Sequence, residues 1–201
     1  TTILKFRHFL ERHGLGKVLF KEVNKHLEKN GLMLREGSIV DASIISAPSS
    51  TKNKDKARDP DMHQTRKGNQ WYFGMKAHIG VDSQNKLIHS VVATSANVHD
   101  SAVIEDLLHG DETRVWGDSA YTGQTDRIKA VAPKARDFTQ QKGSRNRKLT
   151  DVERLKNKTK SKVRARVEHP FHIIKNRFGF TKVRYRGLAK NAHHLFVSCA
   201  L

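Results

Sequence analysis

Residues 37–45 read GSIVDASII, a run of small and β-branched residues that predicts a buried strand whose first apolar half ends at an acid, Asp41. A carboxylate loses hydration when it is buried, so an acid in such a strand needs a compensating partner. A second short run, Arg114-Val115-Trp116-Gly117, ends in the same way at Asp118. Aspartate also caps turns at strand ends, and for each residue alone that structural interpretation stays open.

A third acid, Glu168, interrupts the basic stretch 162–167, which is predicted to be helical. Three carboxylates that come together repel one another unless a cation neutralises them. Magnesium prefers oxygen ligands, and it is usually held by a few carboxylates and completed by the phosphate oxygens of a substrate. Asp41, Asp118 and Glu168 are therefore predicted to be the metal ligands and the catalytic residues of a nuclease that uses Mg²⁺, with Mn²⁺ as a substitute.

The charge of the chain indicates a nucleic-acid partner. The sequence holds 38 Lys and Arg against 20 Asp and Glu, which gives a formal net charge of +18 and an isoelectric point of about 10.2. Residues 141–190 hold seventeen of these basic residues and three acids, a local excess of +14. A run of like charge is also typical of a solvated face or a flexible arm, so both interpretations stay open for residues 142–162 alone.

Composition excludes several other classes. The 201 residues, 36% of them hydrophobic, are enough for one core, and the longest apolar stretches, 90–96 and 195–201, fall far short of the ~20 residues of a membrane span. The single cysteine, Cys199, excludes an internal disulfide and fits a reducing cytoplasm. Twelve histidines stand at no spacing typical of zinc, so a zinc site is not expected.

Apolar periodicity and turn residues predict the order of the elements. The expected elements are helices at 2–12 and 16–30, a strand at 37–45, a polar loop at 47–70, strands at 72–82 and 86–94, a helix at 100–108 capped by Asp100 or Asn97, and a strand at 113–116. From residue 37 onward this is a β-β-β-α-β order, which predicts an α/β fold with a mixed sheet and flanking helices.

The same pass predicts two parts of the chain. Residues 1–35 are expected to be a helical segment, and residues 36–201 are expected to be an α/β domain that holds the three acids. The first residue is Thr1, already inside a helical pattern, and the last is Leu201, inside an apolar run. We therefore expect a fragment of a longer protein, truncated at both ends.

The β-β-β-α-β order is similar to the ribonuclease H-like fold of retroviral-integrase and transposase cores, in which two strands present aspartates side by side and a later helix brings the third acid. The wording of four segments resembles bacterial insertion-sequence transposases of the "five" family; they are VDASII (40–45), KGNQWYFGMKAH (67–78), ANVHDS (96–101) and GDSAY (117–121). In that family the glutamate helix carries Arg, three residues, Glu, six residues and Lys, a spacing that Arg164, Glu168 and Lys175 match. The related "four" family adds a Tyr where this chain has Ser161.

The resemblance implies a transposase that cleaves DNA at insertion-sequence ends and transfers the strand into target DNA. It implies that residues 1–35 are the end of an upstream DNA-binding region and that residues 36–201 are the catalytic domain. It also implies two Mg²⁺ ions per site, double-stranded DNA as partner (terminal inverted repeats and target), a homodimer on DNA, and a bacterial, cytoplasmic and nucleoid-associated location. Two alternatives remain: a catalytically idle DNA-binding fragment of a transposase, and a ribonuclease H-like repair or RNA nuclease.

The glutamate helix is expected to present two faces. At about 100° per residue, Arg164, Glu168, His172 and Lys175 share one face beside an apolar stripe, although a surface helix with paired charges has the same pattern. Pro170 predicts a kink or a restart of this helix beside Glu168. The predicted DNA contacts are Lys67, Trp71, Lys162, Arg164, Arg166, His172 and Lys175. Trp71 is predicted to stack on a base at the DNA end. Because it stands at the start of a strand, a position in the core is the alternative interpretation.

Overall fold

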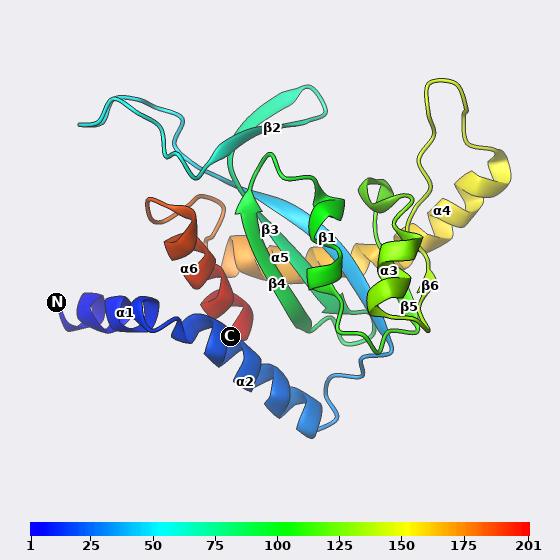
Figure 1. The fold of residues 1–201 in the computed structure, drawn as a ribbon, viewed down its shortest axis with the longest axis horizontal. Coiled ribbons are helices and arrows are strands. Elements are labelled where there is room, and N and C mark those ends of the chain that lie inside the picture. The colour runs from blue at the N-terminus through cyan, green and yellow to red at the C-terminus, as the bar shows by residue number, and fades with distance from the viewer.

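The computed structural model describes residues 1–201, and its centre is one mixed six-stranded sheet (Figure 1). The strands are β1 (Gly37–Ser46), β2 (His63–Lys67), β3 (Gln70–Asp82), β4 (Ile88–Ser95), β5 (Arg114–Trp116) and β6 (Arg136–Asp137). They follow the order β2-β3-β1-β5-β6, and β4 also pairs with β3. Pairs that involve β3 are antiparallel, whereas β1–β5 and β5–β6 are parallel. The predicted mixed sheet is confirmed.

Helices and short turns connect and cover the strands. The α-helices are α1 (Thr2–Arg12), α2 (Leu15–Lys29), α3 (Thr125–Val131), α4 (Asp151–Arg164), α5 (Glu168–His172) and α6 (Leu188–Ala200). The two N-terminal helices confirm the prediction from apolar periodicity, and α1 projects away from the body of the molecule (Figure 1). None of the helices has the combination of length and apolar character needed to cross a bilayer.

Two hydrophobic clusters lie on the two faces of the sheet, and β1 contributes to both. Its residues Ile39 and Ile45 join a cluster of 15 buried residues that includes side chains of α2, α5 and α6. Its residue Val40 joins a cluster of ten with side chains from segment 103–108 and α3. This alternation is the period of two expected of a strand, and it places Ser38 and Asp41 on opposite faces.

Two sequence predictions are wrong. The segment predicted as a helix at 100–108 forms two short 3₁₀ turns, η1 (Asp100–Val103) and η2 (Glu105–Leu107), and the capping side chain is His99 rather than Asp100 or Asn97. The predicted loop 47–70 contains β2, which pairs with β3 as a hairpin. Because β2 is short, polar and on an edge, it shows no apolar alternation that a sequence pattern would reveal.

The irregularity expected at Pro170 is confirmed. Helix α4 ends at Arg164, a 3₁₀ turn spans Ala165–Val167, α5 starts at Glu168, and a π-helical turn covers Ile173–Arg177. Pro170 stands in the first turn of α5, where its missing N–H group removes little, since the first N–H groups of an α-helix have no partner within it. Because of this break, Glu168 begins a separate helix and does not continue the basic helix α4.

Candidate active site

Parallel pairing places the two aspartates next to each other. Ile39 of β1 is paired with Trp116 of β5, and Asp41 and Asp118 each follow two residues later. Strand β5 ends at Trp116, so β1 continues from Val40 onward without a strand neighbour on that side. The open edge of β1 is where the candidate site lies.

A cleft of about 760 Å³ opens at this edge, and all three predicted acids line it. Its wall on the other side comes from α4, α5 and the π turn, which contribute Arg164, Glu168 and Lys175. Phe171 lines the cleft and is buried in the large cluster, together with Val167 and Ile174. The apolar stripe predicted for the glutamate helix therefore anchors this wall, and the acid faces the cleft.

Asp41 is the most buried of the three acids. Burial raises the pKa of its carboxyl from 3.8 to about 6, and the charges of Asp118 and Glu168 add to this rise. The Arg164 guanidinium and the N–H group of Ala42, which donates to Asp41 Oδ1 over 2.8 Å, act in the opposite direction. Asp118 is half-buried, and its Oδ1 accepts from the Ala120 N–H over 2.8 Å. The turn-capping interpretation of Asp118 thus holds together with its place in the cleft.

Arg164 lies between the acids. Its Nη1 is 2.6 Å from Asp41 Oδ2, and its Nη2 is 3.5 Å from Glu168 Oε1. The first contact has the distance of a charge-assisted hydrogen bond, and the second is long. The sequence predicted Arg164 to contact DNA, but it did not predict that this residue pairs with two of the three acids.

The three acids fit a divalent metal ion in the chemistry of their donors. Each is a hard oxygen donor of the kind that Mg²⁺ and Mn²⁺ accept. The raised pKa of Asp41 is caused first by burial, and the charges of Asp118 and Glu168 add to it. In the arrangement described here, however, no group of three His, Cys, Asp or Glu side chains is close enough to hold one ion. The guanidinium of Arg164 takes the cation position beside Asp41.

The cleft contains a fourth acid that sequence reasoning left out. Asp100 lines it, and its Oδ1 is 2.8 Å from Nζ of Lys76, which also donates to the Val98 carbonyl over 2.7 Å. Nearby, the hydroxyl of Tyr121 is fully buried and has no hydrogen-bond partner. Burial, followed by the charges of Asp100, Asp41 and Asp118, raises the pKa of this phenol well above its usual value. Sequence analysis predicted Asp100 as a helix N-cap and did not include it in the site, whereas the structure places it in this cleft.

Three of the predicted DNA contacts line the cleft with the acids: Arg164, Lys67 and Lys175. Lys67 comes from the β2–β3 hairpin, which projects beyond the sheet (Figure 1). Burial and the charge of Lys67 lower the pKa of Lys175, as expected for two cations that face the same space. Trp71, in the same hairpin, is 63% exposed beneath the guanidinium of Arg66, so the alternative that it belongs to the core is wrong.

The other predicted contacts do not line the cleft. Lys162 and His172 are exposed, and the ring of His172 is hydrogen-bonded to Asn176 over 2.8 Å. Arg166 points to the far end of β1, where it donates to the carbonyl of Ser83. Of the predicted shared face, Arg164, Glu168 and Lys175 thus line the cleft, whereas the ring of His172 bonds to Asn176 outside it.

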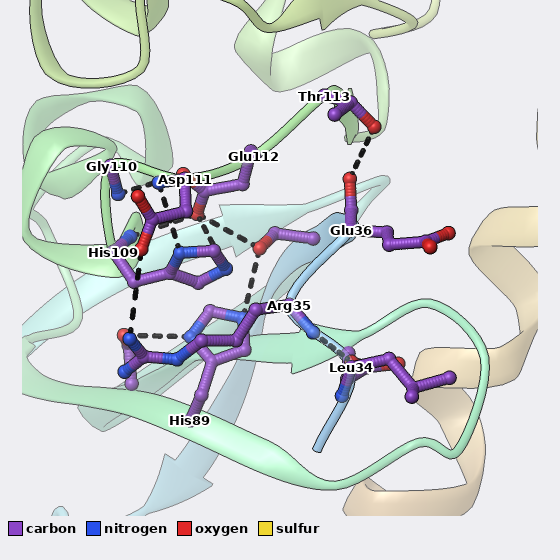
Figure 2. A network of polar contacts seen from close by, with 12 residues as sticks. Leu34, Arg35, Glu36, His89, His109, Gly110, Asp111, Glu112 and Thr113 are labelled. Atoms are coloured by element: carbon purple, nitrogen blue, oxygen red, sulfur yellow. Dashed lines mark hydrogen bonds and ion pairs between the residues drawn. The ribbon is translucent and has the colours of Figure 1, made fainter. Parts of the chain in front are cut away.

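A second polar cluster, on the opposite face of β1, was not predicted at all (Figure 2). Glu112 is fully buried; its Oε1 accepts from the Ser38 hydroxyl and the His109 N–H, and its Oε2 accepts from the Gly110 N–H. Ser38 is also 3.0 Å from the ring of His89, whose pKa is lowered to about 3 by burial and then by His109 and Arg35. The members of this cluster come from three separate segments, 35–38, 89 and 109–112, so no local spacing in the sequence reveals it.

A mixed sheet with one aspartate in β1 and another just after the parallel strand β5, and with a glutamate helix across a basic cleft, is the arrangement of the ribonuclease H-like fold class. Within that class the chain belongs to the transposase DDE domain family, whose model matches residues 33–201. No solved structure matches the chain significantly. The predicted DDE transposase and its fold are confirmed. Transposases of this family act on DNA and generally use divalent metal ions.

Proposed function

We propose that this chain cleaves DNA at the ends of an insertion sequence and joins the freed 3′-OH to target DNA. The observation that supports it is the meeting of Asp41, Asp118 and Glu168 in one cleft that also holds Lys67 and Lys175. The narrower assignment to the bacterial "five" family rests on the resemblance of its segments. The division into a helical segment, residues 1–35, and a catalytic domain, residues 36–201, rests on the same resemblance.

Asp41, Asp118 and Glu168 are the residues that would hold two Mg²⁺ ions, or Mn²⁺ in their place. Bound there, such ions supply activation of a water and stabilisation of the leaving 3′ oxygen. The chain itself supplies position and charge. The buried strand β1 fixes Asp41, and the anchored α5 fixes Glu168, so the acids keep their places while the substrate changes.

The basic residues around the acids would bind the DNA backbone. Lys67 and Lys175 face the cleft and would hold the phosphates next to the cut, while the exposed residues of segment 142–162 would bind the duplex farther away. Counterion release makes such binding steeply dependent on salt. The exposed ring of Trp71 would stack on a base at the DNA end. Because transposition joins two ends, we propose a homodimer on DNA.

Cleavage and strand transfer on a labelled duplex that carries an element end, with Mg²⁺ or Mn²⁺, test this function. We expect metal-dependent nicking by the wild-type chain, and its loss in Glu168→Gln with DNA binding retained on a parallel gel. Binding without cleavage in both proteins would instead identify an idle DNA-binding fragment. Preferential cleavage of the RNA strand in a hybrid would identify a ribonuclease H-like RNA nuclease.

A further inference from the structure

Arg164 contributes the closest positive charge to the acids of the cleft. Its guanidinium is 2.6 Å from Asp41 and 3.5 Å from Glu168, and its side chain is three-quarters buried. It is the last residue of α4, directly before the 3₁₀ turn, so its backbone belongs to a different element from that of Glu168. Asp118 has no cation within ion-pair distance, and its Oδ1 accepts only from a backbone N–H group.

This arrangement resembles a metal site in which a side chain stands in for the ion. Three acids that share a cleft need a cation, and Arg164 is the one that contacts Asp41 Oδ2. A divalent ion bound to that oxygen would carry twice the charge of the guanidinium and would repel it at short range. Both cations cannot contact Asp41 Oδ2 favourably at once, so one excludes the other.

We propose that Arg164 is an exchangeable counter-ion, which neutralises Asp41 and Glu168 before a divalent ion arrives and is displaced when the ion binds. A displaced guanidinium at the wall of a basic cleft is free to bind a phosphate of DNA, with the fork geometry that suits phosphate oxygens. The second half of this inference rests on the proposed function. It makes metal and DNA cooperative ligands, and by linkage each must strengthen the binding of the other by the same factor.

The first experiment measures the affinity of the metal-free protein for Mn²⁺ alone, without DNA, at pH 8, where Asp41 is ionised. We expect Arg164→Gln to bind Mn²⁺ about tenfold more tightly than the wild type, because the ion no longer has to displace a cation. The matched control is Arg186→Gln. Arg186 lies outside the cleft, and its Nη1 is 2.6 Å from Asp55 Oδ2. We expect no change in this control. Equal or weaker Mn²⁺ binding by Arg164→Gln would overturn the exchange.

Thermal unfolding of each variant verifies that the fold persists. Arg164→Lys provides a second measurement, because it keeps a positive charge and loses the planar fork that matches a carboxylate. We expect its Mn²⁺ affinity to lie between those of the wild type and Arg164→Gln. An order in which Arg164→Lys binds Mn²⁺ most tightly of the three would contradict a counter-ion role.

The second experiment repeats the Mn²⁺ titration in the presence of a saturating DNA duplex under conditions without turnover. We expect DNA to tighten Mn²⁺ binding by the wild type about tenfold and to have a smaller effect on Arg164→Gln. If the wild type cleaves DNA but DNA tightens Mn²⁺ equally in both proteins, the coupling through Arg164 is wrong and the proposed function stands. If Arg164→Gln binds Mn²⁺ more tightly but no protein cleaves DNA, the exchange stands and the proposed function fails.

Discussion

Glu112 and Asp41 are both buried carboxylates that lie at strand β1, on its opposite faces, and their surroundings differ (Figure 2 shows the first). Glu112 accepts hydrogen bonds from two backbone N–H groups and the Ser38 hydroxyl, so few of its carboxylate acceptor positions remain free. Asp41 accepts from one backbone N–H and from an arginine, and three further acids share its cleft. A buried acid with complete partners supports the fold, whereas one with incomplete partners is available for chemistry.

The largest expected difference between the two faces is in activity. We expect Asp118→Asn to lower the rate of DNA cleavage by a factor on the order of 10³, because it removes a charged ligand that acts in the transition state. Stability should change by less than about 1 kcal/mol, since Asn retains an oxygen that can cap the turn at Ala120. Single-turnover cleavage and urea unfolding measure the two effects. A variant that cleaves at the wild-type rate would remove Asp118 from the catalytic set.

The opposite outcome is expected for Glu112. Replacing it by Ala leaves the N–H groups of His109 and Gly110 and the hydroxyl of Ser38 without their acceptor, a loss of about 3 kcal/mol in the free energy of unfolding. Urea unfolding measures it, with Glu22→Ala on the exposed face of α2 as the control, expected to change stability by about 0.5 kcal/mol at most. Equal losses of unfolding free energy in Glu112→Ala and Glu22→Ala would show that the polar cluster around Glu112 does not stabilise the fold.

Lowering the pH is expected to increase the contribution of Asp41 to stability and to decrease that of His89. The folded pKa of Asp41 is raised to about 6, so its contribution to stability is complete below pH 3.8 and is lost as the pH rises through 6. The folded pKa of His89 is lowered to about 3, so its contribution is complete above pH 6.5 and is lost as the pH falls towards 3. Across its window the effect is roughly 3 kcal/mol for Asp41 and roughly 5 kcal/mol for His89.

Urea unfolding of the metal-free wild type, Asp41→Asn and His89→Gln at pH 4.5, 6 and 8 measures this contrast. Between pH 4.5 and pH 8 we expect Asp41→Asn to gain stability relative to the wild type. We expect His89→Gln to lose stability relative to the wild type over the same interval. Variant curves that run parallel to the wild type would mean that neither burial changes the protonation of its group.

The smallest expected effect is on DNA binding, at Trp71 near the tip of the β2–β3 hairpin. Trp71→Ala should weaken binding of a duplex with unpaired end bases by about fivefold, roughly 1 kcal/mol, and leave the stability unchanged because the ring is 63% exposed. Leu201→Ala, which truncates an exposed apolar side chain outside the hairpin, is the control and should not affect binding. A loss of stability in Trp71→Ala without a loss of binding would return this residue to a packing role.

The sequence was sufficient where one element determines the feature. The apolar runs before Asp41 and Asp118 predicted both strands and their acids, and Pro170 predicted the break beside Glu168, because these signals are local. It was insufficient where distant segments meet. The pair Arg164–Asp41 joins residues 123 positions apart, and no spacing within a helix or strand predicts it. The strand β2 was missed for a different reason, because it is short, polar and on an edge and shows no apolar alternation.

The length of β5 has a consequence for the order in which the molecule opens. Asp41 stands in a ten-residue strand paired along nine positions with β3, whereas Asp118 follows a strand of only three residues, whose other neighbour, β6, has two. Amide hydrogens of β1 and β3 should therefore exchange with solvent only on global unfolding, and those around Val115 should exchange through smaller openings. One aspartate belongs to the slowest-exchanging part of the chain, and its neighbour belongs to a part that can adjust while the other stays in place.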